Sequence, residues 1–336
     1  MLTVLESLPE GLLDCEAAEL YRVLDGPTLI HLEGRRPEPL FVSVLMHGNE
    51  DSGWQAIRAL LRDYQQRDLP RALSVFIGNV AAARYGRRLL DGQPDYNRVW
   101  KGNGLPEQAM MAMVVDEMRR RRVFASIDIH NNTGHNPHYA CINRLDDTFM
   151  QLAILFSRTV VYFTKPDGVQ SMAFAELCPA VTVECGLRSQ AYGATHAHEF
   201  INAALHLQTI PNHPLPAGDI DLFHTVVIVK VPEVLDIDFT GNDNCDLSFA
   251  PDVDRLNFSE LPANTLIGRL GSRRKAWLEA WDEQGNEVGE RYFRYDDNEI
   301  RLTTTVMPSM LSCDPRIVRQ DCLCYLMERL SNGRVE

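Results

Sequence analysis

The sequence has little positive charge, and this deficit limits the partners that the protein can have. Lysine and arginine total 33 against 46 aspartates and glutamates, so the formal net charge is −13. A field of that sign repels nucleic acids and anionic membrane surfaces, and we therefore expect neither as a partner. A small anionic substrate remains compatible with this charge, because it responds to the local field of its pocket.

The chain also lacks a membrane-spanning run, a secretory leader and paired cysteines. No stretch approaches the ~20 consecutive apolar residues that cross a bilayer. The first 20 residues have no basic start and contain four glutamates and one aspartate, so we expect no secretory signal. The eight cysteines are scattered without a C-x-x-C pair, which is typical of reduced thiols. Together these features predict a soluble, cytoplasmic protein.

The first 210 residues alternate between segments typical of strands and segments typical of helices. The expected strands, rich in β-branched and apolar residues, span residues 39–47, 72–80, 124–130 and 180–186. The expected helices, with apolar residues at helical spacing, span residues 51–67, 107–122, 147–160 and 191–207. This alternation predicts an α/β fold, with a mixed twisted sheet flanked by helices. Ligands of such sheets bind beyond the carboxyl ends of the strands.

The composition changes at residues 211–219, "PNHPLPAGD", whose prolines and glycine are typical of a linker. Beyond it, β-branched or alternating runs are interrupted by glycine, asparagine and aspartate. This pattern predicts a smaller β-rich domain or barrel. We therefore predict two domains, at residues 1–212 and 213–336.

Histidine and glutamate side chains follow the expected strands at spacings that suit a metal. His47 and Glu50 follow the first strand in "HGNE", and His130 ends the third strand in "SIDIH". Two histidines and a glutamate leave a fourth position for water, which is the open arrangement of a catalytic zinc site. The alternative is that both histidines simply cap strand ends. H-x-x-E alone is weak, since His196 and Glu199 repeat it within an expected helix, where we interpret them as a solvated face.

A further glutamate and a loop rich in arginine lie near the same sheet edge. Glu184 ends the strand "VTVECG"; it can begin a turn, but beside a metal it becomes a candidate general base. The loop at residues 87–102 contains Arg88, Asn97 and Arg98, whose planar donors suit a carboxylate or a developing oxyanion. The alternative for these arginines is a surface position without a role.

Taken in order, these stretches resemble the succinylglutamate desuccinylase/aspartoacylase family of the zinc carboxypeptidase superfamily. The matching stretches are "HGNE" (47–50), "RLLDGQPDYNR" (88–98), "DIHNNT" (128–133) and "VECG" (183–186). The resemblance spans roughly residues 40–210 and, more loosely, the β-rich C-terminal half. It implies that residues 1–212 form a zinc-hydrolase catalytic domain with a carboxypeptidase-like fold.

The resemblance also implies a role for each residue of the expected site. One zinc ion per chain would bind His47, Glu50 and His130, with Glu184 as general acid and base. Arg88 would stabilise the oxyanion, and Asn97 with Arg98 would hold the α-carboxylate of the substrate. Tyr192 is the candidate for the substrate-binding tyrosine of the family.

Three functions are compatible with this set of residues. The leading hypothesis is a zinc-dependent amidohydrolase that cleaves the amide bond of a small N-acyl amino acid. The alternative is a metallocarboxypeptidase that acts on short peptides. A metal-binding protein without catalysis is disfavoured, because such a protein has no need of Glu184 as a base. The sequence leaves open the acyl group, the amino acid, a possible homo-oligomer, and whether His135 or His138 contacts substrate or a second metal.

Overall fold

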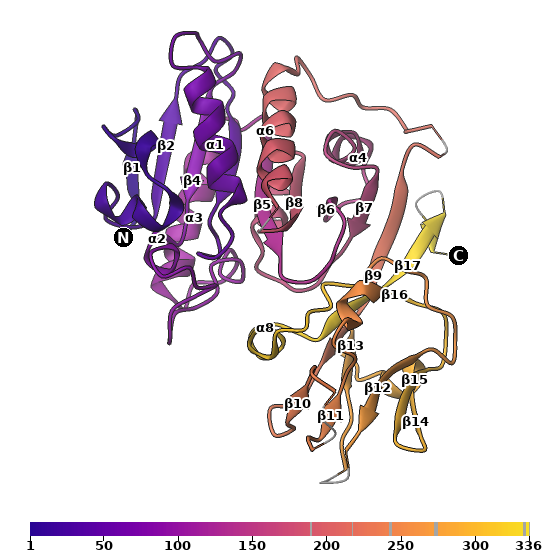
Figure 1. The fold of residues 1–336 in the computed structure, drawn as a ribbon. Coiled ribbons are helices and arrows are strands. Elements are labelled where there is room, and N and C mark those ends of the chain that lie inside the picture. The colour runs from indigo at the N-terminus through magenta and orange to yellow at the C-terminus, as the bar shows by residue number, and fades with distance from the viewer. Residues whose placement is uncertain (189, 217, 242–243, 272–274, 332–333, 336) are drawn as a thin grey trace. The chain divides into compact units, whose positions relative to one another are not determined.

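The computed structural model describes residues 1–188, 190–216, 218–241, 244–271, 275–331 and 334–335, and it divides into two compact units (Figure 1). The first unit comprises Met1–Asn131, His138–Tyr162 and Pro166–Leu222. The second unit comprises Asn132–Pro137, Phe163–Lys165 and Phe223–Glu336. The predicted domain boundary between residues 212 and 213 stays a prediction.

The first unit is built on a mixed sheet with the strand order β1-β2-β4-β3-β5-β8-β6-β7. In chain order these strands are β1 (Thr3–Leu5), β2 (Thr28–Leu32), β3 (Leu40–Val44), β4 (Leu73–Ile77), β5 (Ala125–Asn132), β6 (Tyr139–Ile142), β7 (Thr159–Tyr162) and β8 (Ala180–Leu187). Strand β3 runs parallel to both β4 and β5, whereas β2 is antiparallel to β4 and β6 is antiparallel to β8. The carboxyl ends of β3, β4 and β5 therefore meet at one edge of the sheet.

Helices flank this sheet, which explains the burial of its central strands. Every residue of β3, β4 and β5 is buried, as expected when both faces of a sheet are covered. The helices are α1 (Ser52–Asp63), α2 (Val80–Ala83), α3 (Pro106–Arg120), α4 (Asp147–Ala153), α5 (Gln170–Phe174) and α6 (Ala191–His206), with 3₁₀ turns η1 (Leu12–Asp14) and η2 (Ala17–Arg22). Helix α1 packs on α6 and β3, and α4 packs on β6 and β8. The predicted α/β class is confirmed.

The second unit is rich in β-structure, as the sequence predicts. One group of strands has the order β13-β9-β17-β16, with β18 paired to β17. These strands are β9 (Asp221–Lys230), β13 (Glu279–Asp282), β16 (Met307–Ser309), β17 (Cys324–Ser331) and β18 (Arg334–Val335). A separate sheet has the order β10-β11-β12-β15-β14. Its strands are β10 (Ile237–Asp238), β11 (Leu247–Ser248), β12 (Leu266–Leu270), β14 (Phe293–Asp296) and β15 (Glu299–Leu302), and η3 (Val253–Leu256), α7 (Gly289–Tyr292) and α8 (Pro315–Gln320) complete the unit.

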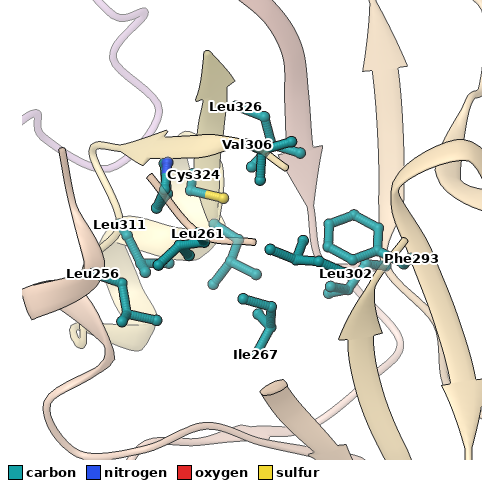
Figure 2. A pocket seen from close by; sticks show the side chains of 12 residues that line it. Leu256, Leu261, Ile267, Phe293, Leu302, Val306, Leu311, Cys324 and Leu326 are labelled. Atoms are coloured by element: carbon teal, nitrogen blue, oxygen red, sulfur yellow. The ribbon is translucent and has the colours of Figure 1, made fainter. Parts of the chain in front are cut away.

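An apolar pocket lies within the core of the second unit (Figure 2). All its lining side chains are apolar: Leu256, Leu261, Ile267, Leu278, Phe293, Leu302, Val306, Pro308, Leu311, Leu323, Cys324 and Leu326. Because no acid, base or charged group lines it, this pocket offers no chemistry for hydrolysis.

Several element boundaries differ from the sequence prediction. The helix expected over residues 147–160 ends at Ala153, and the β-branched segment that follows joins the sheet as β7. The first expected strand ends at Val44, so that His47 lies in a turn. Strand β8 extends to Leu187, and Glu184 therefore lies within the strand rather than at its end.

Two other observations concern the chain as a whole. All eight cysteines are free. In the part of the chain that the structure describes, every helix is too short or too polar to cross a membrane.

Candidate metal centre

A tight turn after β3 brings His47 and Glu50 to the sheet edge. Leu45 is fully buried and has a φ of 56°, a left-handed conformation that turns the chain away from the strand. The His47 carbonyl then accepts a hydrogen bond from the Glu50 amide at 3.1 Å. Gly48 passes so close to helix α2 that an added Cβ would lie 2.2 Å from the Ala83 nitrogen. Glycine is therefore required between the two candidate ligands.

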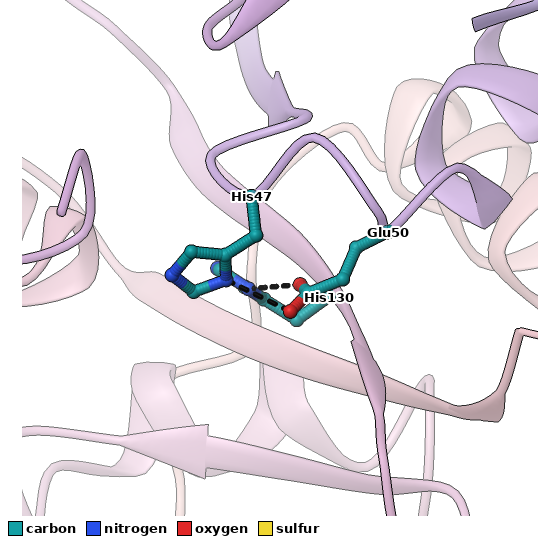
Figure 3. Close-up of side chains that lie close together, drawn as sticks. All are labelled: His47, Glu50 and His130. Atoms are coloured by element: carbon teal, nitrogen blue, oxygen red, sulfur yellow. Dashed lines mark hydrogen bonds and ion pairs between the residues drawn. The ribbon is translucent and has the colours of Figure 1, made fainter. Parts of the chain in front are cut away.

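The three predicted metal ligands converge within the first unit (Figure 3). The Nδ1 atom of His47 lies 2.8 Å from Glu50 Oε1, and Nδ1 of His130 lies 2.7 Å from Glu50 Oε2. One ligand atom from each residue lies within 4.8 Å of the others. All three side chains are buried, with 3–4% of their surface exposed. Among the described residues, this is the only such group of histidine, cysteine, aspartate or glutamate side chains.

Each imidazole also contacts a second carboxylate, which the sequence prediction missed. His47 Nε2 lies 3.0 Å from Asp95 Oδ1, and His130 Nε2 lies 2.8 Å from Asp128 Oδ2. Asp128 is fully buried and accepts a hydrogen bond from the Ser43 hydroxyl at 2.6 Å. Metal-binding histidines typically donate their remaining N–H to such a carboxylate. The sequence did contain a signal for Asp128, because Asp128 and His130 are two residues apart on one strand and their side chains therefore lie on the same face of the sheet.

The charges of this group fit a divalent cation. Each imidazole lies between two carboxylates, so both ring nitrogens donate and the ring carries a positive charge. Burial opposes that charge, but Glu50 and Asp95 outweigh it and raise the pKa of His47. Burial likewise disfavours ionised Glu50, yet His47 and His130 lower the pKa of Glu50. A divalent ion replaces the two Nδ1 protons without changing the total charge, so the donor set suits zinc.

Glu184 provides an ionisable carboxyl on strand β8, which is the neighbour of β5 in the sheet. It is 8% exposed, and its Oε2 atom is buried without a hydrogen-bond partner among the described residues. Burial raises the pKa of Glu184 to about 8, with His130 opposing and Glu50 adding to the shift. A carboxyl group of this pKa can gain or lose a proton near neutral pH, as general acid–base catalysis requires.

Arg88 reaches the candidate ligands from the arginine-rich loop. It is buried, its Nη2 donates to Asp95 Oδ2 at 3.1 Å, and its Nη1 lies 3.6 Å from Glu50 Oε1. The guanidinium thus carries positive charge into the same group of side chains that contains Glu50. This position suits a donor to a developing oxyanion. One nitrogen of the guanidinium, Nη2, is already bonded to Asp95.

Asn97 and Arg98, the two residues predicted to bind a carboxylate, lie in the same loop. The Asn97 Nδ2 atom is 3.2 Å from His130 Nε2, and Asn97 Oδ1 accepts from the backbone amide of Gln170 at 3.0 Å. Arg98 is half-buried, and its Nη1 donates to the Asn97 carbonyl at 2.9 Å. The loop thus places Asn97 beside His130 and the Arg98 guanidinium against the Asn97 backbone.

The remaining predicted residues lie in other groups of side chains. Tyr192 is 66% exposed, and its ring stacks on His138 at 5.2 Å. His135 belongs to the second unit, where its Nδ1 lies 2.7 Å from Asp254. The interpretation of His196 as a solvated residue is wrong, because it is half-buried and its Nε2 bonds to the Phe156 carbonyl at 2.6 Å.

Replacing Asp128 by asparagine is expected to weaken zinc binding about 10- to 100-fold, since the carboxylate that orients His130 is lost. Competition with a chromophoric chelator measures the zinc dissociation constant. Asp63→Asn is the matched control, because Asp63 is an exposed aspartate that also bonds to a histidine, His198. If Asp128→Asn bound zinc as tightly as the wild type, Asp128 would not have the role of orienting His130.

A mixed α/β sheet that carries a buried His-Glu-His cluster is the arrangement expected from the resemblance to the zinc carboxypeptidase superfamily. The model of the succinylglutamate desuccinylase/aspartoacylase catalytic domain matches residues 39–210, just over half of the chain. The protein therefore belongs to the succinylglutamate desuccinylase/aspartoacylase family. No curated protein sequence matches the chain.

Solved structures with the same fold are similar to this chain at low sequence identity. Succinylglutamate desuccinylase from Chromobacterium violaceum is 18% identical, with a TM-score of 0.55 over 88% of this chain and 86% of that one. The product-bound ectoine utilization protein EutE from Ruegeria pomeroyi is 14% identical, with a TM-score of 0.57 over 90% and 88%. Murine aminoacylase 3 is 13% identical, with a TM-score of 0.53 over 88% and 96%. At these identities the likeness establishes the fold.

Proposed function

We propose that the protein is a zinc-dependent amidohydrolase that cleaves the amide bond of a small N-acyl amino acid. The observation that carries this proposal is the convergence of His47, Glu50 and His130 in one buried group. His47 Nδ1, His130 Nδ1 and the Glu50 carboxylate would hold one zinc ion per chain. Zinc bound there would polarise the scissile carbonyl and make water acidic enough to attack near neutral pH.

Glu184 performs the proton transfers in this proposal. Its buried Oε2 accepts a proton from the attacking water and returns that proton to the leaving nitrogen. Water and amide thus give a carboxylate and a protonated amine, and both protons of the water end on the leaving nitrogen, with no further reactant. Support comes from the raised pKa of Glu184, because a carboxylate of higher pKa is a stronger base toward the attacking water, and a pKa of about 8 still lets it release the proton near neutral pH.

The arginine-rich loop binds and polarises the substrate. The Nη1 atom of Arg88 lies 3.6 Å from Oε1 of the proposed zinc ligand Glu50. From this position the guanidinium stabilises the negative charge that develops on the carbonyl oxygen of the substrate. Asn97 and Arg98 hold the α-carboxylate, for which a forked guanidinium is the suitable partner. The positive charges of Arg88 and Arg98 also explain how a chain of net charge −13 attracts an anionic substrate.

A hydrolysis screen tests the proposed function directly. N-acetyl amino acids, N-succinyl amino acids and short peptides are incubated with the zinc-loaded protein, with and without a chelator. We expect chelator-sensitive release of the free amino acid from at least one N-acyl amino acid. Cleavage restricted to the C-terminal residue of peptides would instead establish the metallocarboxypeptidase alternative. Equal hydrolysis in the presence of chelator would contradict zinc dependence.

Replacing Arg98 by alanine is expected to raise KM for substrates with a free α-carboxylate about 10- to 100-fold, because a charge-assisted hydrogen bond to the anion is lost. The kcat value is expected to change much less. The matching α-carboxamide substrates provide the control, since they lack the charge. An equal rise in KM for carboxylate and carboxamide substrates would remove the assigned role of Arg98.

A further inference from the structure

A pair of side-chain amides joins the chain just after β4 to the arginine-rich loop at residues 87–102. Asn79 Nδ2 donates a hydrogen bond to Gln93 Oε1 at 3.0 Å, and Gln93 Nε2 donates to Asn79 Oδ1 at 3.0 Å. Asn79 is buried and Gln93 is half-buried. Because each amide both donates and accepts, the pair fixes the separation and the relative orientation of the two side chains.

Backbone groups on both sides hold the two amides in this orientation. Asn79 Oδ1 also accepts from the Ala82 amide at 3.1 Å, and the Asn79 amide donates to the Leu45 carbonyl at 2.6 Å. Gln93 Oε1 also accepts from the Leu90 amide at 3.0 Å, and the Gln93 amide donates to the Leu90 carbonyl at 3.0 Å. The pair therefore connects the turn after β3, which begins at Leu45, to the middle of the loop.

Asp95, two residues after Gln93, contacts the candidate metal centre. Its Oδ1 atom lies 3.0 Å from His47 Nε2 and accepts from the Asn97 backbone amide at 2.7 Å. Its Oδ2 atom accepts from Arg88 Nη2 at 3.1 Å. A displacement of Asp95 would therefore move the hydrogen-bond partner of a candidate zinc ligand.

Pro94 connects Gln93 to Asp95 and makes this short link stiff. The proline ring fixes the φ angle of residue 94 near about −65°. The ring also restricts the residue before it, Gln93, to extended conformations. The position of Gln93 is therefore transmitted to Asp95 through a backbone that has little freedom to adjust.

We propose that Gln93 is a positioning residue that, through its amide pair with Asn79, holds Asp95 against His47 and so orients this imidazole for zinc. An imidazole that donates its Nε2 proton to a carboxylate keeps Nδ1 free to bind the ion and has a fixed ring direction. This inference rests on the zinc site of the proposed function and deepens it, since it names the residues that align one of the ligands.

The zinc dissociation constant of Gln93→Leu tests this role in the full-length protein. Leucine nearly matches glutamine in size, but it can neither donate to Asn79 nor accept from it. We expect the zinc Kd to rise about 3- to 10-fold, which is less than the about 10- to 100-fold rise caused by removing a direct partner of a ligand. Competition with a chromophoric chelator measures Kd without any hydrolysis.

Gln108→Leu is the matched control, because Gln108 is a half-buried glutamine that holds the chain just after the arginine-rich loop. Its Oε1 accepts from the amides of Gly104 and Leu105 at 2.8 and 3.0 Å, and its Nε2 donates to the Lys101 carbonyl at 2.7 Å. The control thus also loses side-chain amide hydrogen bonds that hold the chain. Its zinc Kd is expected to equal that of the wild type.

A double-mutant cycle with Asp95→Ala separates positioning from a general effect on the fold. Asp95→Ala alone is expected to raise the zinc Kd about 10- to 100-fold. On that background Gln93→Leu is expected to add less than about 2-fold, because the carboxylate that Gln93 positions is gone. A role in stability alone would give the same factor with and without Asp95. Circular dichroism monitors the fold, and where alanine impairs folding Asp95→Asn replaces it, with the factor for Gln93→Leu again expected to fall.

The outcomes distinguish this proposal from the proposed function. An unchanged zinc Kd in Gln93→Leu, an equal rise in Gln108→Leu, or the same factor with and without Asp95 overturns the positioning role. A wild type that binds zinc but hydrolyses no compound of the screen contradicts the proposed function alone, because the dissociation constants do not depend on hydrolysis. Absence of zinc binding by the wild type overturns both proposals.

Discussion

Glu184→Gln is expected to reduce kcat by about 10²- to 10⁴-fold, while the protein retains its zinc. The glutamine amide has nearly the shape of the carboxyl group, but it cannot accept the proton of the attacking water. General acid–base catalysis typically contributes a factor of this size. The measurements are kcat on the best substrate of the screen and zinc content by atomic emission.

Glu199→Gln is the matched control for this variant, because Glu199 is an exposed glutamate on α6. Its kcat is expected to equal that of the wild type. If Glu184→Gln hydrolysed the substrate at the wild-type rate, the assigned base would be wrong. Loss of zinc from Glu184→Gln would place Glu184 among the metal ligands instead.

The same variant gives a pH-dependent result in the chelated protein. The pKa of Glu184 is raised from 4.5 to about 8 in the folded state, so its contribution to stability falls as the pH rises between these values. Glutamine does not ionise, so Glu184→Gln removes this pH-dependent decrease in the free energy of unfolding. Chelated Glu184→Gln is therefore expected to be more stable than the chelated wild type by roughly 2–3 kcal/mol at pH 7, with a smaller difference at pH 5. Denaturant unfolding at both pH values measures the difference.

His130→Ala is expected to lower zinc content from about one ion per chain to below about 0.1, and to abolish hydrolysis. The substitution removes one of three ligands and leaves Asp128 and Glu50 without the positive charge that lies between them. Buried carboxylates without a partner also destabilise the fold. Zinc content after dialysis is the primary measurement, and circular dichroism monitors the fold.

A second variant keeps this test decisive where alanine impairs folding. His130→Asn retains a polar side chain between the two carboxylates, and its zinc content is expected to fall similarly. His198→Ala is the control, since His198 is a half-buried histidine on α6 that bonds to Asp63. Wild-type zinc content in a folded His130 variant would exclude His130 as a ligand.

The strands and helices that position the site were predictable, because each is long enough to show a regular apolar pattern. Strands β3, β4, β5 and β8 and helices α1, α3 and α6 correspond to segments expected from periodicity. Short strands were not predictable, since the edge strand β1 has three residues and the internal strand β6 has four. The helix predicted over residues 147–160 extended into the first two residues of β7, because the apolar residues after α4 continue its pattern and only contacts in the sheet distinguish helix from strand there.

The candidate ligands were predictable from sequence, whereas the groups around them were not. His47, Glu50 and His130 follow or belong to strands that periodicity identifies, and the family resemblance assigned them together. Asp95 lies in an irregular loop, where no periodicity indicates the direction of a side chain. The pairing of Asn79 with Gln93 joins the chain after β4 to the same loop, and only the folded backbone brings the two amides together.

A crystal structure of the zinc-loaded protein, with anomalous scattering data at the zinc absorption edge, tests the central claim most directly. We expect one anomalous peak per chain, about 2.0–2.1 Å from Nδ1 of His47 and of His130 and about 2.0–2.2 Å from a Glu50 oxygen. A peak bound by other side chains, or no peak in crystals that contain one zinc per chain, would contradict the assignment of this group as the metal centre.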